Sequence, residues 1–271
     1  MIARISLVTM LVCATAGGAS AGDRTSLVLW NAGGQAGMTL ASAAIQHKIH
    51  SWRDVWRCLG AGSASGLGIY QAKSLVGQNH PATGWILANV AGSLSENAAA
   101  GRHPLAQIGY TLGPVRFRVS MPRLDRDARS WIAVDASVYE AAMLAVSFSE
   151  SGRPRFRDGL IAFRDEREGI SYGQTAGVFP ATFVDDQVVW LHELTHAVQA
   201  LQLDAAEPAS PWPKMQFHQH ASGGRRLIVF EQIKIGMYNF ANDFYEDLVP
   251  YERRWTEIEA FKLTEGVDLR R

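Results

Sequence analysis

The sequence has few cysteines, no surplus of charge of either sign and no internal repeat. Its two cysteines are too few for a disulfide-rich scaffold. With 26 basic and 26 acidic side chains in 271 residues, the chain lacks the basic surplus expected of a general nucleic-acid binder. A hydrophobic fraction of 47% argues against a disordered chain. The length suits one or two folded domains with a substantial core.

Residues 1–21 have the pattern of a secretory signal peptide. Arg4 provides the positive start, residues 5–13 the apolar centre, and Ala-Ser-Ala at 19–21 the small-residue cleavage site. The apolar stretch is short for a membrane span. We therefore expect an exported protein, located in the periplasm or outside the cell. Cleavage leaves Cys58 as the single cysteine, which we expect to be a buried small side chain.

Residues 22–103 are rich in Gly, Ala and Ser and predict an α-helical subdomain. Uncharged stretches cover 25–46, 58–72 and 74–95, and helical spacing is found over 38–56, 65–76 and 85–100. Glycines four residues apart, Gly33 with Gly37 and Gly62 with Gly66, favour close helix packing. Three roles stay open for this half: structural support, membrane association through residues 26–100, and a pro-segment covering a site later in the chain.

Residues 104–271 change to a pattern of period two, which predicts strands. Residues 115–119 alternate strictly between apolar and basic side chains, and Gly113-Pro114 separates them from 108–112, which indicates a hairpin. Further strands are expected at 131–134 and 160–164, and a strand or extended loop at 169–183. Together with predicted helices, this pattern favours an α+β fold with a small, mostly antiparallel sheet within residues 106–184.

Two helices are expected between and after these strands. Asp135 is a natural N-cap for a helix over 137–148. Residues 226–239 have an apolar stripe at helical spacing, formed by Leu227, Phe230, Ile233 and Met237.

The most informative stretch is the helix predicted after Asp185, a natural N-cap. Leu191, Leu194, Val198 and Leu201 give it an apolar face. His192 and His196 lie four residues apart, so both imidazoles project from one side of the helix at the separation that a single Zn²⁺ requires. Glu193, next to the first histidine, is placed to reach a metal-bound water rather than the metal itself.

This His-Glu-x-x-His motif resembles that of the zincin-type metallopeptidases. The metzincin extension is absent, because Gln199 and Gln202 replace its glycine and its third histidine. Gluzincins instead take a glutamate from a downstream helix, often in a Glu-x-x-Ala pattern, and Glu257 and Ala260 match that pattern. The resemblance implies a zincin-like domain over 104–271, with Glu257 as the third zinc ligand.

Some features depart from the gluzincin pattern or leave alternatives. Many gluzincins have an aspartate one place after the alanine, where this chain has Phe261. Glu259 is the alternative glutamate ligand, and His218 and His220 are competing ligands. The long spacing from the motif to Glu257 is closer to the CAAX-type endopeptidases than to thermolysin-like enzymes. The string His-Glu-Leu-Thr-His-x-Val-Gln is also similar to metallopeptidase-like domains of secreted bacterial toxins.

The expected activity is zinc-dependent hydrolysis of peptide bonds. Zn²⁺ held by His192, His196 and Glu257 would keep one position for water, and Glu193 would accept its proton and return it to the leaving amine. An extended peptide substrate would pair with a strand at 170–177 or 178–184. The candidates for stabilising the oxyanion are Tyr238, Tyr245 and Tyr251. Two other functions stay open: a zincin-like binding or assembly protein with little turnover, and a membrane-associated structural protein in which the motif is incidental.

Overall fold

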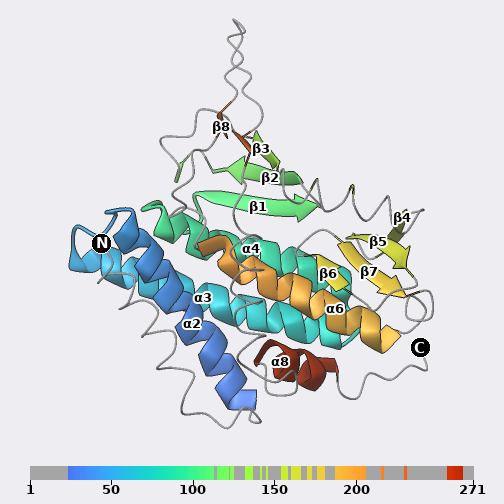
Figure 1. Ribbon diagram of the computed structural model, residues 1–271. Helices are drawn as coiled ribbons and strands as arrows, with labels where there is room; N and C mark the ends of the chain where they lie inside the picture. Colours follow the sequence, from blue (N-terminus) through green and yellow to red (C-terminus); the bar gives the residue numbers. More distant parts are fainter. Residues whose placement is uncertain are drawn as a thin grey trace, which may run out of the picture.

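The structure is a computed structural model, and three long helices make up the first part of it (Figure 1). They are α2 (Arg24–Ile45), α3 (Trp52–Gly77) and α4 (Pro81–Ala99). The described residues are 24–112, 115–121, 123, 124, 132–136, 141, 145, 154–157, 160–165, 170–172, 176–180, 187–205, 215, 216, 229, 230 and 255–264. The predicted signal peptide lies outside them.

The helix expected over 38–56 is wrong at its centre, because α2 ends at Ile45 and α3 begins at Trp52. His47 adopts a left-handed backbone conformation with φ of 57°, which ends the helical path. The new helix starts with a capping box, in which the Ser51 side chain accepts from the backbone of Asp54 and the Asp54 side chain accepts from the backbone of Ser51. The helices expected over 65–76 and 85–100 correspond to α3 and α4.

The strands form two small sheets instead of the single sheet expected within residues 106–184, and the fold is mixed α+β. The first sheet has the order β1-β2-β3-β9-β8, and the second has β4-β5-β7-β6. The predicted hairpin is confirmed: β1 and β2 are antiparallel, with Leu112 opposite Val115. The strand bounds are β1 Gln107–Leu112, β2 Val115–Ser120, β3 Ile132–Ala136, β4 Pro154–Arg157, β5 Leu160–Asp165, β6 Ile170–Tyr172, β7 Ala176–Pro180, β8 Met215–Gln216 and β9 Val229–Phe230.

Two expectations for strands and helices need correction. Val229 and Phe230 form β9, which pairs with β3 and β8, so the helix expected over 226–239 is wrong at this point. Both are β-propensity side chains, and pairing with neighbouring strands outweighs the apolar helical spacing. Asp135 belongs to β3, and the helix expected over 137–148 falls almost entirely outside the described residues.

Helix α4 holds the hairpin by bonding to the edge strand β1. Trp85 Nε1 donates to the Thr111 carbonyl at 3.0 Å, and Asn89 Oδ1 accepts from the Thr111 amide at 2.8 Å. One turn further on, Ser93 Oγ accepts from the Gly109 amide at 2.9 Å. These side chains recur every four residues on one face of α4. They satisfy backbone groups that an uncovered edge strand would leave unpaired.

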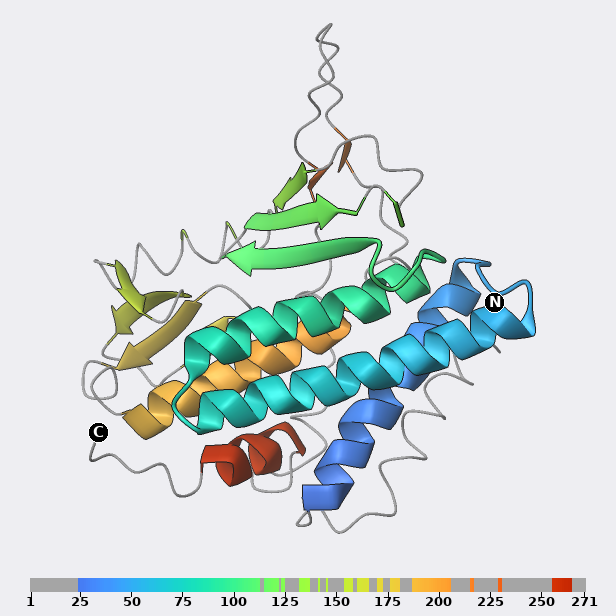
Figure 2. The same ribbon diagram turned by 180° about the vertical axis from the view of Figure 1, so that it is seen from behind.

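Helices α3 and α4 share one core with α6 (Gln187–Ala200), which carries the motif. Figures 1 and 2 show α6 lying along α3 and α4, with α8 (Trp255–Thr264) beside α6. The predicted apolar face of α6 is buried in this core. The core consists of Ile69, Ala72 and Val76 from α3, Trp85, Ala88 and Ala91 from α4, Trp190, Leu191, Leu194, Ala197 and Val198 from α6, and Leu201 from the short 3₁₀ helix Leu201–Ala205.

Small residues let α2 and α3 approach each other closely. A Cβ added to Gly62 would lie 2.6 Å from Ala36 Cα, and one added to Gly66 would lie 2.1 Å from the carbonyl oxygen of Asn31. The expected packing role is therefore observed for this pair of glycines. A Cβ on Gly33 would meet nothing within 4 Å, so that residue has no such role. Within the described residues, no helix is both long and apolar enough to cross a membrane.

Candidate metal centre

Helix α6 presents both histidines of the motif on one side, as their spacing predicts. The other side of the helix is fixed in the core by Leu191, Leu194 and Val198. The imidazole rings of His192 and His196 have centroids 4.8 Å apart and planes at 79°. Their Nε2 atoms lie 3.1 Å apart, so the two lone-pair positions converge on the same point.

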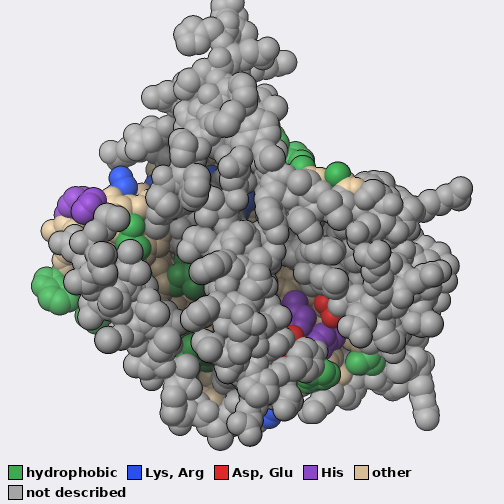
Figure 3. All heavy atoms as spheres, viewed as in Figure 1, with side chains coloured by type: hydrophobic (Ala, Val, Ile, Leu, Met, Phe, Trp, Pro, Cys, Tyr) green, Lys and Arg blue, Asp and Glu red, His purple; other side chains and the backbone are tan. Residues whose placement is uncertain are grey.

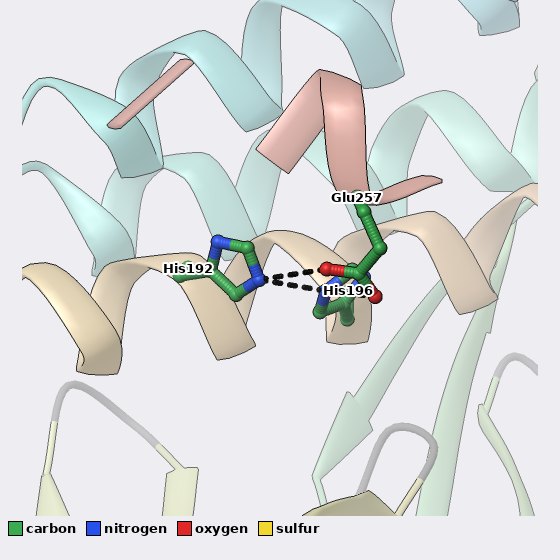
Figure 4. Close-up of side chains that lie close together, drawn as sticks. All are labelled: His192, His196 and Glu257. Carbon is green, nitrogen blue, oxygen red and sulfur yellow. Dashed lines mark hydrogen bonds and ion pairs between the residues drawn. The ribbon is translucent and has the colours of Figure 1, made fainter. Parts of the chain in front are cut away.

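Helix α8 brings Glu257 to the same point. Its Oε2 lies 3.1 Å from His192 Nε2, and its Oε1 lies 3.4 Å from His196 Nε2. Figure 4 shows the carboxylate directed at the two rings across the gap between α6 and α8. The three residues offer ligand atoms that all lie within 4.8 Å of one another. The structure thus brings together the three residues predicted to bind zinc.

The spacing of these atoms suits a tetrahedral ion. Zinc–nitrogen and zinc–oxygen bonds of about 2.0–2.2 Å place neighbouring ligands of a tetrahedron about 3.3–3.6 Å apart, and the separations of 3.1 and 3.4 Å found here are close to that range. Two neutral imidazoles and one carboxylate are also a ligand set that zinc prefers. The side chains of His192, His196 and Glu257 keep exposed fractions of 10%, 13% and 13%, so the cluster is not sealed within the helical core. Figure 3 shows histidine and acidic side chains together on the face over α6.

The charged groups of the cluster shift each other's protonation. Burial raises the pKa of Glu193, although the nearby charges of His196 and His192 work in the opposite direction. For His196, burial alone would lower the pKa. Its hydrogen bond with Glu257 and the charges of Glu257 and Glu193 outweigh burial, and the pKa is raised. The arrangement therefore concentrates groups whose proton affinities differ from their ordinary values, as functional sites commonly do.

Glu259, the alternative ligand, faces a different set of partners. Its Oε2 lies 2.5 Å from Lys73 Nζ, and both side chains are almost fully buried. Its Oε1 accepts from Asn31 Nδ2 at 2.7 Å. Glu257 and Glu259 are two residues apart on α8 and contact different partners: Glu257 contacts the histidines, and Glu259 contacts Lys73. The geometry therefore favours Glu257 as the ligand.

Three residues near the cluster make contacts that the sequence did not predict. Gln199 Oε1 lies 2.8 Å from His196 Nδ1. Phe261, in the position of the aspartate that many gluzincins have, packs its ring against His192 with centroids 4.6 Å apart. Lys73, from α3, contacts Glu259. Its signal in the sequence is that it stands alone between two uncharged stretches, 58–72 and 74–95.

Several expected site residues lie outside the described residues. They are the helix cap Asp185, the competing ligands His218 and His220, and the oxyanion candidates Tyr238, Tyr245 and Tyr251. The strand expected at 169–183 is represented by β6 and β7. β7 pairs with β5 over 176–180 and with β6 over 176–178, so a substrate cannot pair with residues 176–178, while residues 181–184 lie outside the described residues.

No family model matches this chain, and the comparisons with curated proteins and with solved structures found no match either.

Proposed function

We propose that this protein is an exported, zinc-dependent metallopeptidase with a zincin-like catalytic domain. The observation that carries the proposal is the convergence of His192 Nε2, His196 Nε2 and the Glu257 carboxylate from two helices, at separations that match the edges of a zinc tetrahedron. Three protein ligands leave a fourth position open, which is the arrangement of catalytic rather than structural zinc sites.

Zinc bound here would polarise the scissile carbonyl and lower the pKa of a coordinated water. The chain's own contribution to proton transfer comes from Glu193, which follows His192 directly on α6. Burial raises the pKa of its carboxyl, and this makes the carboxylate a better proton acceptor near neutral pH. We assign Glu193 the role of accepting a proton at its carboxylate and delivering it to the departing amine.

The second sheet offers a strand for an extended substrate. In the order β4-β5-β7-β6, strand β6 is at the edge, and it contacts α6. A peptide added to Ile170–Tyr172 would continue the sheet through backbone hydrogen bonds and pass beside the helix that carries the histidines. This supports a peptide or protein as the substrate, and residues 170–172 as its docking strand.

The first experiment measures the metal content of the purified chain 22–271 beside the His196→Ala variant. About one zinc per wild-type chain, lost in the variant, would support the site. Proteolysis of a peptide library that disappears in Glu193→Gln, while zinc stays bound, would support the enzyme. Zinc without Glu193-dependent hydrolysis would instead favour a binding or assembly protein. No bound metal after zinc is supplied would overturn the proposal and direct attention to residues 26–100.

A further inference from the structure

The orientation of the Gln199 amide is determined by its partners. Gln199 Nε2 lies 2.9 Å from Glu259 Oε2 and 3.1 Å from the carbonyl oxygen of Thr256. A backbone carbonyl can only accept a hydrogen bond, so the amide group must turn its NH₂ towards Thr256 and Glu259. Its oxygen, Oε1, then faces His196 Nδ1 at 2.8 Å. Gln199 can therefore only accept from this histidine.

This orientation selects one tautomer of His196. Because Gln199 Oε1 accepts, His196 Nδ1 must carry the proton and donate. A neutral imidazole has a single N–H, so the lone pair is left on Nε2. That atom is the one directed at His192 and Glu257, 3.1 Å from His192 Nε2. The hydrogen bond thus presents the correct nitrogen of His196 to an ion, as the remote nitrogen of a metal-binding histidine commonly does.

A buried ion pair keeps the Gln199 amide in this orientation. Glu259 receives hydrogen bonds from Lys73 Nζ, Asn31 Nδ2 and Gln199 Nε2. An ammonium and two amide NH₂ groups can only donate, so the oxygens of Glu259 act as acceptors in all three hydrogen bonds. Lys73 in turn donates to Asn31 Oδ1 at 2.7 Å, and Gln202 Nε2 donates to the same oxygen. The donor and acceptor assigned to each of these hydrogen bonds are thus consistent with those of the others.

The same pair also anchors helix α8. The side chains of Lys73 and Glu259 have exposed fractions of 0% and 2%, so their contact is fully shielded from water. It ties the α8 turn that carries Glu257 to α3, while Asn31 ties it to α2. Lys73 of α3 and Asn31 of α2 therefore hold Glu259, two residues from Glu257 on the same helix.

We propose that Gln199 is a positioning residue for His196 and that the buried Lys73–Glu259 pair holds the Gln199 amide in the required orientation. The inference rests on the proposed metal site and deepens it. It assigns to the N-terminal helices a part in assembling that site.

The test compares zinc affinity, by competition with a chromogenic chelator, in the wild type, Gln199→Leu and Gln35→Leu. Gln35 is the matched control: it is buried and donates to Ser95 Oγ and the Gln202 carbonyl, but it makes no hydrogen bond to the histidines. We expect Gln199→Leu to bind zinc about 10- to 100-fold more weakly, and Gln35→Leu to bind it as the wild type does.

A second readout separates positioning from general loss of structure. In ¹⁵N-histidine NMR spectra at alkaline pH, where His196 is neutral, the metal-free wild type should show the Nδ1–H tautomer and Gln199→Leu a mixture. Replacing the ion pair by apolar side chains, Lys73→Met with Glu259→Met, should preserve folding and reproduce the mixed tautomer and weaker zinc binding. Should Gln199→Leu fail to fold, this double variant and Gln199→Asn provide the same comparison.

The outcomes distinguish this inference from the proposed function. A wild-type protein that binds no zinc would remove the metal site itself. A wild type that binds zinc, with unchanged affinity and unchanged tautomer in the Gln199 and ion-pair variants, would overturn the positioning role alone. Equal losses in Gln199→Leu and Gln35→Leu would also overturn it, because the effect would then belong to core hydrogen bonding in general.

Discussion

Glu257 and Glu259 lie two residues apart on α8 and bind different partners: Glu257 Oε2 is 3.1 Å from His192 Nε2, and Glu259 Oε2 is 2.5 Å from Lys73 Nζ. The short separation along the helix turns the two carboxylates through about 200°, at 3.6 residues per turn. One glutamate therefore faces the histidines of α6, while the other enters the helical core.

Substituting Glu257 should mainly weaken zinc binding, whereas substituting Glu259 should mainly lower stability. Glu257→Gln removes a charged ligand and should weaken zinc binding strongly, with a small effect on the free energy of unfolding. Glu259→Gln leaves Lys73 buried without its counter-ion and should lower the free energy of unfolding by about 3–5 kcal/mol. Zinc competition and urea denaturation on both variants would check this. Comparable stability losses in both would contradict the assignment.

Glu193→Gln should abolish peptide hydrolysis and leave zinc bound. Because burial raises the pKa of Glu193, its ionised form carries an energetic cost at neutral pH. Removing that charge should therefore raise the thermal stability of the metal-free protein, with a gain of about 1 kcal/mol. Glu193→Asp keeps the charge and serves as the control. Calorimetry at pH 7 would measure both, and a lower melting temperature for Glu193→Gln would contradict the argument.

The stability of the metal-free protein should depend on the protonation of His196. Its ordinary pKa is 6.5, and the folded protein raises it through Glu257 and Glu193 despite the opposing effect of burial. A raised pKa contributes stability that is fully present below pH 6.5 and is lost as the pH rises through the folded value. Urea denaturation across this range should show the loss, and His196→Ala should flatten it.

Zinc should reverse that trend. Metal binding needs neutral His196, so zinc affinity should increase as the pH rises through the same window. The stabilisation that zinc adds should grow accordingly. A zinc-induced shift in melting temperature that falls with rising pH in this window would contradict the assignment of His196 as a ligand.

The fragment 104–271 should neither fold stably nor bind zinc. Its helix α6 buries Trp190, Leu191 and Val198 against α3 and α4, and its Glu259 depends on Lys73 from α3. Removing residues 22–103 exposes this apolar face and leaves the Glu259 carboxylate without Lys73. Circular dichroism and zinc content of the fragment would test this. A fragment more active than the chain 22–271 would instead support the pro-segment interpretation of the N-terminal half.

Gly66→Ala should destabilise the protein, because the added methyl group would meet the Asn31 carbonyl at 2.1 Å. Separating α2 from α3 should cost about 1–3 kcal/mol of unfolding free energy. Gly60→Ala is the matched control on the same helix. A Cβ there meets nothing within 4 Å, so its better helix propensity should stabilise the protein by roughly 0.5–1 kcal/mol. Equal effects of the two substitutions would contradict the close packing.

Local pattern was enough to predict the helix of the two histidines, whereas the helix that carries Glu257 was expected from the resemblance to gluzincins. Spacing of four residues places His192 and His196 on one face of a helix, because helical geometry is independent of the rest of the chain. Strict alternation over 115–119 likewise predicted the β1–β2 hairpin. The pattern did not predict the break at His47 between α2 and α3. It also did not predict that Val229 and Phe230 pair with a strand far away in the sequence.

The sequence by itself determined which chemical groups are available: two imidazoles at helical spacing, the Glu193 carboxylate beside them, and one pair of glutamates further along the chain. Only the tertiary structure decided between Glu257 and Glu259, because the choice depends on which helix each side of α8 faces. It also brings Gln199 to His196, and Lys73 to Glu259, its partner 186 residues away in the chain. No spacing rule links residues so far apart, since their meeting depends on how α3, α6 and α8 pack around one core.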